Sequence, residues 1–152
     1  MLANHIQIIT LRMNLIGNWS GYYEYGEGYA LPHFGERVNI SVVLDGNNDK
    51  FIGTVKEDGS EYSVPLKATI QGFSEDQFVS FIKRYPKIPR IIESGSSELE
   101  MDNGSLEIEH VGSIDAKFNS MYGSWTIIQD YEDEQGTYQE AVHGIWMLKK
   151  VD

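Results

Sequence analysis

Short runs of alternating apolar and polar residues follow one another along this chain from residue 14 onward, with clusters of turn residues between them. In the first run, 14–25, every odd-numbered position holds leucine, glycine or a large aromatic residue. Successive strand side chains point to opposite faces of a sheet, so this period of two predicts strands rather than helices. Eight strands are expected, at 14–25, 37–44, 51–56, 66–71, 77–85, 106–112, 117–129 and 142–151.

The segments between these strands are predicted to be turns and loops. Turns are expected at 45–48, 57–60 and 72–76, where Gly, Asn, Asp and Ser gather. The segment 87–104 breaks the alternation and is predicted to be the longest irregular stretch, with the one candidate helix start at 86–93. The acidic run 130–136 is predicted to be the loop that joins the last two strands.

Each of the three tryptophans follows a glycine by two residues. The pairs are Gly17 and Trp19, Gly123 and Trp125, and Gly144 and Trp146. A glycine in a strand allows a large ring or another backbone to lie close against it, and the tryptophan two residues on points to the same face. Because one pair is early and two are late, we expect the first and last strands to meet. The chain is therefore predicted to be all-β, an eight-stranded antiparallel up-and-down barrel, in preference to a two-sheet sandwich of similar strand spacing.

The chain resembles the calycin superfamily of lipocalins, fatty-acid-binding proteins and avidins. The resemblance rests on the Gly-x-Trp pairs and on Phe81-x-Lys83-x-Tyr85 in the fifth expected strand. It implies that the Trp19 ring closes one end of the barrel, packed against Trp146 or Leu148 and beneath the aliphatic stem of Lys149 or Lys150. The lipocalin disulfide and the helical lid of the fatty-acid-binding proteins have no counterpart here, and the biotin-contacting pattern of avidins does not map onto 18–31. The chain is most similar to small bacterial members of this group whose function is unassigned.

Length and composition indicate a single globular domain. We expect residues 14–152 to form the barrel and 1–13 to be an N-terminal extension, with Ile6, Ile8 and Leu11 docked on the barrel if ordered. The absence of cysteine excludes disulfides, thiolate zinc sites and cysteine nucleophiles. The net charge of −11 opposes binding to nucleic acid or to an anionic membrane and leaves a basic protein partner open. The N-terminus lacks signal-peptide features, so a cytoplasmic location is expected.

No catalytic, metal or cofactor motif stands out among the polar residues. The four histidines (His5, His33, His110 and His143) are scattered, and surface or strand-end positions are expected for them. The carboxylates at 132–134 lack the spacing of a calcium loop and are expected in a solvated turn. Ser20 lies outside any nucleophile elbow. Lys83 and Arg84 could bind an anion at the barrel mouth, although charges that reach solvent from a strand end are favoured.

The inward-facing aromatic residues are the most informative feature for function. They could line a cavity or fill the barrel completely, and both alternatives stay open. If the barrel is hollow, the expected ligand-binding residues are Tyr23, Tyr25, Phe81, Lys83, Tyr85 and Trp125. The sequence thus predicts a binding protein for a small, partly apolar or amphipathic ligand. The alternative is an acidic interaction module of the immunity type with a filled core, and an enzyme is the third possibility.

Overall fold

The computed structural model describes residues 12–93 and 95–151, and over these residues the chain is built almost entirely from strands. The one helical element in this part is a single 3₁₀ turn, Ala116–Phe118. The strands are β1 (Gly17–Tyr25), β2 (Arg37–Asn47), β3 (Lys50–Glu57), β4 (Ala68–Glu75), β5 (Phe78–Tyr85), β6 (Ile88–Ile91), β7 (Leu99–Asp102), β8 (Leu106–Asp115), β9 (Ser120–Asp133) and β10 (Gly136–Lys150).

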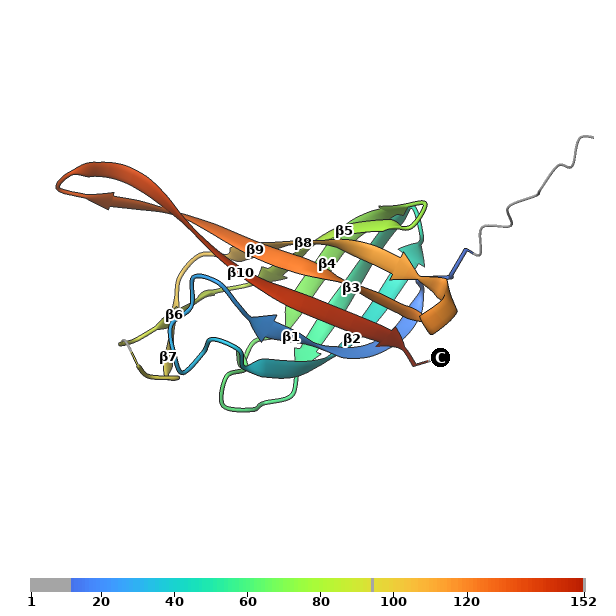
Figure 1. Cartoon of the computed structure of the whole chain (residues 1–152), viewed down its shortest axis with the longest axis horizontal. Coiled ribbons are helices and arrows are strands. Elements are labelled where there is room, and N and C mark those ends of the chain that lie inside the picture. The colour runs from blue at the N-terminus through green and yellow to red at the C-terminus, as the bar shows by residue number, and fades with distance from the viewer. Residues whose placement is uncertain (1–11, 94, 152) are drawn as a thin grey trace, which may run out of the picture.

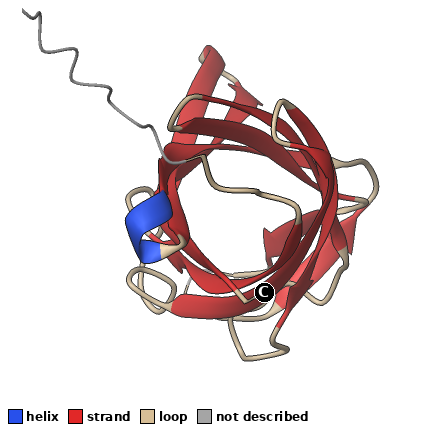
Figure 2. Ribbon diagram, turned by 90° about the vertical axis from the view of Figure 1, so that its right-hand side faces the viewer, coloured by secondary structure: helices blue, strands red, loops and turns tan. Residues whose placement is uncertain are grey.

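Eight of these strands form one closed antiparallel barrel. Around the barrel their order is β1-β10-β9-β8-β5-β4-β3-β2, and β6 and β7 form a separate two-stranded hairpin (Figures 1 and 2). The barrel closes because β1 pairs with both β2 and β10, which places Trp19 opposite Val42 on one side and Lys150 on the other. The prediction of an all-β, eight-stranded antiparallel up-and-down barrel with meeting first and last strands is confirmed.

The segment 87–104 corrects the sequence prediction, because it contains the β6–β7 hairpin and is not irregular throughout. The candidate helix start at 86–93 is also wrong, since β6 occupies this position. Each strand of the hairpin is only four residues long, too short for a period of two to be recognised. Arg90 of β6 forms ion pairs with Glu100 and Asp102 of β7, so cross-strand contacts stabilise the hairpin where the pattern is weak.

The acidic run 130–136 is likewise not a loop over most of its length. Strand pairing between β9 and β10 continues out to Asp133 opposite Gly136, so the two strands form one long hairpin. Figure 1 shows this hairpin extending beyond the rest of the barrel. The backbone at Gly136 has a φ of +129°, which only glycine adopts readily, and this allows the tight reversal after Asp133.

The glycine–tryptophan pattern works across strands as well as along them. Gly144 lies opposite Trp125, and a Cβ added at Gly144 would lie 2.2 Å from atoms of the Trp125 ring. In the same way, a Cβ at Gly112 would lie 2.8 Å from the ring of Trp146. Glycine in these strands therefore makes room for two large indole rings inside the barrel, which is the close approach predicted from the sequence.

The end of the barrel at the start of β1 is closed and filled. Trp19 is 1% exposed, and its indole Nε1 donates to the Leu15 carbonyl at 2.9 Å. Residues 12–16 cross this opening (Figure 2). They are held there by Asn48, whose side chain accepts from the Leu15 N–H at 2.9 Å and donates to the Met13 carbonyl at 2.7 Å. Residues 14–16 belong to this crossing segment, so β1 begins at Gly17 and not at residue 14 as predicted.

Lys150 completes the closure, because its ammonium donates to the carbonyl of Asn14. Lys150 also pairs with Trp19 across the β1–β10 seam. The predicted packing of the Trp19 ring against Trp146 or Leu148 stays a prediction. The expected domain boundary between residues 13 and 14 falls within this docked segment. The predicted docking of Ile6, Ile8 and Leu11 lies outside the described residues.

Candidate functional site

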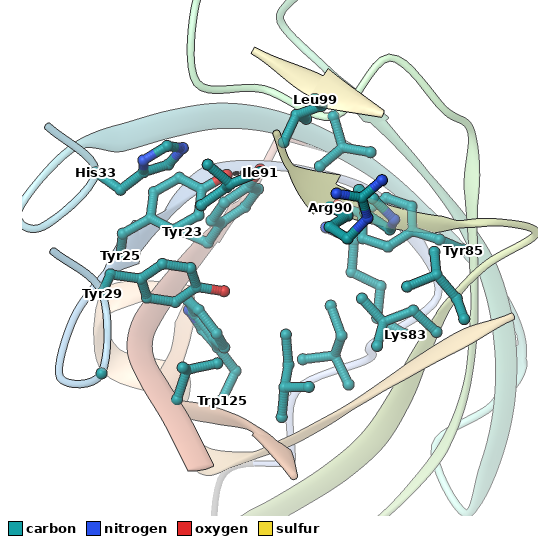
Figure 3. A pocket seen from close by; sticks show the side chains of 18 of the residues that line it. Tyr23, Tyr25, Tyr29, His33, Lys83, Tyr85, Arg90, Ile91, Leu99 and Trp125 are labelled. Atoms are coloured by element: carbon teal, nitrogen blue, oxygen red, sulfur yellow. Dashed lines mark hydrogen bonds between the residues drawn. The ribbon is translucent and has the colours of Figure 1, made fainter. Parts of the chain in front are cut away.

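The opposite half of the barrel contains a cavity of about 450 Å³. Its walls come from the inward faces of the barrel strands, and residues of the loop after β1 and of the β6–β7 hairpin lie at its mouth (Figure 3). Most of the wall is apolar, from residues that include Val64, Ile91, Leu99, Ile108, Ile127 and Val142. The barrel is therefore filled at one end and hollow at the other. Of the two alternatives left open by the sequence, the structure shows the cavity and not a completely filled barrel.

Five of the six residues predicted to bind a ligand line this cavity. They are Tyr23, Tyr25, Lys83, Tyr85 and Trp125, all at most 7% exposed. Phe81 is the exception, because it lies one inward position away from Lys83 along β5 and is not among the lining residues. Its ring stacks on His110 with 4.5 Å between the ring centroids and contacts Trp146 edge-on at 5.1 Å. Phe81 thus belongs to the packed core beside the cavity.

Glu57 is the centre of the polar network at this site, and sequence reasoning missed it. Its Oε1 accepts from the Tyr23 hydroxyl at 2.5 Å and from the Val64 N–H at 2.8 Å. Its Oε2 accepts from the Lys83 ammonium at 3.3 Å and from the Tyr85 hydroxyl. The side chain of Glu57 is only 2% exposed, so every one of these bonds is formed away from solvent.

A signal for Glu57 was nevertheless available in the sequence. Phe51, Gly53, Val55 and Glu57 occupy alternate positions, so Glu57 continues the inward face of β3. The sequence prediction placed position 57 in a turn, because Asp58, Gly59 and Ser60 follow directly. The structure shows that the strand includes Glu57 before the chain turns.

Lys83 lies inside the barrel and does not reach solvent, so the favoured prediction for it is wrong. Its side chain is 4% exposed, and its Nζ lies 4.6 Å from the ring centroid of Tyr23 and 4.7 Å from that of Tyr85. Two aromatic faces and one carboxylate therefore surround the cation. Burial lowers the pKa of Lys83, although Glu57 opposes this effect. Arg84, the next residue, is exposed and pairs with Glu107 on the barrel surface.

The tyrosine hydroxyls of the cluster are hydrogen-bond donors over the whole physiological pH range. Burial raises the pKa of Tyr23 and of Tyr85 well above the usual value, and the neighbouring Glu57 carboxylate raises both further. Burial also raises the pKa of Tyr25 to about 12. The Tyr25 hydroxyl donates to the Tyr62 carbonyl at 2.6 Å. The cluster therefore presents neutral phenols around one carboxylate and one ammonium.

Two histidines, His33 and His110, are also part of this region, and both are buried, so the prediction of surface or strand-end positions is wrong for them. His110 is 5% exposed, and burial, together with the nearby Lys83 charge, lowers its pKa to about 3. Its Nδ1 lies 3.0 Å from the Ile108 carbonyl, which can only accept, so Nδ1 carries the proton of a neutral imidazole. His33, in the loop after β1, is 4% exposed. Its ring lies against Tyr25 and Tyr62 at the cavity mouth.

Aromatic rings form one continuous side of the cavity (Figure 3). Tyr29 meets Tyr25 edge-on, with 4.9 Å between the centroids, and meets Trp125 at 5.9 Å. Trp125 in turn contacts Tyr23 at 6.3 Å. Edge-to-face pairs of this kind stabilise one fixed arrangement of rings, so this side of the cavity is preorganised rather than collapsed.

No metal centre accompanies the cluster in the part of the chain that the structure describes. Over those residues, no group of three or more His, Asp or Glu side chains is placed to hold a metal ion. Ser20 is exposed on the outer face of β1. The side chains of the predicted acidic turn at 132–133 lie outside the described part. The described residues also include no helix with the length and apolarity needed to cross a membrane.

Comparisons with protein-family models, with curated proteins and with solved structures found no match for this chain. The Lys83 ammonium can offer further hydrogen bonds to a bound molecule. The hydroxyls of Tyr23 and Tyr85 already donate to Glu57 and that of Tyr25 to the Tyr62 carbonyl, so these phenols can only accept.

Proposed function

We propose that this protein is a calycin-like barrel that binds a small, uncharged, partly apolar ligand in its cavity. The observation that carries the proposal is the combination of an apolar-walled space of about 450 Å³ with one buried polar cluster on its wall. Ligand sites in proteins are typically cavities of about 300–1,000 Å³ in which a few convergent polar groups fix the orientation of the ligand. The filled end of the barrel stabilises the fold and leaves the other end free for binding.

The charge balance of the cluster favours a neutral ligand. Glu57 and Lys83 are side by side with opposite charges, so together they contribute no net charge to the cavity. A ligand carboxylate close to Lys83 would also lie close to Glu57, and like charges repel strongly at a site with little water. A neutral oxygen that accepts a hydrogen bond from the Lys83 ammonium meets no such repulsion. The ligand is therefore an apolar molecule with a hydroxyl or carbonyl group.

A basic protein partner is the alternative function, and it has less support. The net charge of −11 favours it, but the filled core that accompanied this alternative is not what the structure contains. Such a partner would be recovered from native mass measurements at low salt and lost as salt rises, because long-range charge attraction is screened. Retention of a partner at high salt would count against a charge-driven interaction.

A pair of variants on β9 tests the proposed ligand site. Ile127 lines the cavity, whereas its neighbour Ile128 points outward and is 59% exposed. Ile127→Trp places an indole in the cavity, so we expect it to abolish binding of the neutral probe Nile red, measured by the rise in dye fluorescence. Ile128→Trp is the matched control and should bind as the unmodified protein does. Equal dye binding by both variants, with unchanged thermal melting, would show that the dye binds elsewhere.

A further inference from the structure

We infer that the ligand is an aldehyde or ketone and that the Nζ of Lys83 joins its carbonyl carbon as an imine. This inference rests on the proposed function of the cavity and names the ligand class for that same site. The first observation is the position of one amine. Of the residues that line the cavity, Lys83 is the one lysine, and its side chain is almost completely removed from solvent. The other lysines of the described chain do not line this space.

The Lys83 amine has capacity for a further bond. Among the described residues, the Glu57 carboxylate is the hydrogen-bond acceptor found for Nζ, at 3.3 Å, and the faces of Tyr23 and Tyr85 account for its other close neighbours. An ammonium has three donors, so two N–H groups have no acceptor in this set. A carbonyl oxygen entering the cavity is the type of group that these donors bind, and this contact brings the carbonyl carbon to the nitrogen.

Glu57 can serve as the proton acceptor and donor that imine formation requires. One ammonium proton passes to Glu57 Oε2, and the neutral amine then uses its electron pair to attack the carbonyl carbon. The carbonyl oxygen becomes a carbinolamine hydroxyl by taking one proton from nitrogen. Glu57 returns its proton to this hydroxyl, the carbon–oxygen bond breaks and water leaves. An ammonium and a carbonyl have become an iminium and a water, with no oxidant, reductant or other reactant needed.

The product keeps the electrostatics of the site unchanged. The iminium carries one positive charge, as the ammonium did, and Glu57 is again a carboxylate. The cation therefore keeps both its ion pair with Glu57 and its position between the rings of Tyr23 and Tyr85. Burial lowers the pKa of Lys83, which makes the neutral amine more accessible than that of a surface lysine. The apolar walls hold the remainder of the ligand.

Reductive trapping tests this inference on the full chain. The protein is incubated with octanal and sodium cyanoborohydride, and the labelled lysine is located by peptide mass mapping. We expect one octyl group per chain, carried by Lys83, and loss of this label in the variant Lys83→Arg. Lys56→Arg, on the outer face of β3, is the matched control and should keep the label on Lys83. Label spread over surface lysines, or no label, would overturn the inference.

A parallel measurement with 1-octanol separates this inference from the proposed function. Octanol has the same chain length and cannot form an imine. Displacement of Nile red by octanol, together with no label on Lys83 from octanal, would leave the proposed binding function standing and reject the covalent step. Failure of octanol to bind, with no label from octanal, would reject both. Because the label is mapped on the unmodified protein, the result does not depend on whether Lys83→Arg folds.

Discussion

Glu57 accepts hydrogen bonds from four groups inside the barrel, and one of them is a charged ammonium. A single carboxylate thereby orients three side chains that come from β1 and β5. A buried charge that loses its partner is costly, because neither water nor another ion replaces the lost interaction. The stability of this half of the barrel should consequently depend strongly on one residue.

We expect Glu57→Gln to lower the free energy of unfolding by about 3–5 kcal/mol, the range for breaking a buried ion pair. Urea melts at neutral pH measure the change. Glu107→Gln is the control, because Glu107 forms an ion pair with Arg84 on the surface, where both side chains are half exposed. Its loss should cost less than about 1 kcal/mol. Similar losses for the two variants would show that the Glu57 cluster has no special energetic role.

His110 should make the barrel sensitive to mild acid. Its pKa is about 3 in the folded protein and about 6.5 when unfolded, so the unfolded chain binds the extra proton between these values. Stability is therefore highest above pH 6.5 and falls as the pH falls toward 3. The expected loss from this one group between pH 7 and pH 5 is about 2 kcal/mol.

The measurement that isolates His110 is the pH dependence of urea melts for His110→Asn beside the unmodified protein. The variant removes the titrating group and should show a shallower dependence between pH 7 and pH 5, even if its stability at pH 7 is lower. An identical dependence in both proteins would assign the acid sensitivity to other groups. This comparison uses slopes, so a uniform loss of stability in the variant does not affect it.

Individual strands differ in how clearly the sequence predicts them. Most of the barrel strands were predictable because an inward face repeats every second residue, and the fifth, apolar on both faces in sequence, was predictable as an apolar run bounded by turn residues. The four-residue strands β6 and β7 are too short for such a repeat, and their pairing depends on contacts between Arg90 and the two acidic residues opposite. The end of β3 was misplaced because the residues after Glu57 favour a turn.

The residues of the site likewise divide into those that the sequence predicts and those that it does not. Tyr23, Tyr25, Tyr85 and Trp125 were predictable as inward residues from their positions in long strands, whereas the buried position of Lys83 was not the favoured prediction. Which of them line a space and which fill the core could not be predicted, since that depends on how eight strands meet in three dimensions. Phe81 illustrates this limit, because it has the same inward parity as Lys83 yet packs against His110 and Trp146.

The first strand and the segment before it close one end of the barrel through Trp19. We expect Trp19→Ala to lower the free energy of unfolding by about 3–5 kcal/mol, as is typical of a buried Trp→Ala change. The ring is 1% exposed, and its N–H bonds to the Leu15 carbonyl, so both packing and a hydrogen bond are lost. Denaturant melts check the value. A loss under about 1 kcal/mol would contradict the role of Trp19 in closing the barrel.

Trp125→Ala provides the comparison within the same barrel. Trp125 lines the cavity, so its removal enlarges a space that already exists and should also weaken binding of Nile red. Trp19 lies at the filled end, so Trp19→Ala molecules that remain folded should bind Nile red with the same affinity as the unmodified protein. Loss of dye binding in Trp19→Ala molecules that are still folded would indicate that the two ends of the barrel are coupled.

Closure between β1 and β10 also determines when this molecule can acquire its final form during synthesis. Trp19 pairs with Lys150, so the seam of the barrel joins residues from nearly opposite ends of the described chain. A growing polypeptide on the ribosome can pair β1 with β2, β2 with β3 and so on, but the seam has no partner until β10 emerges. Until that moment both β1 and the newest strand present unpaired backbone groups, and such open edges are where a sheet can pair with another chain.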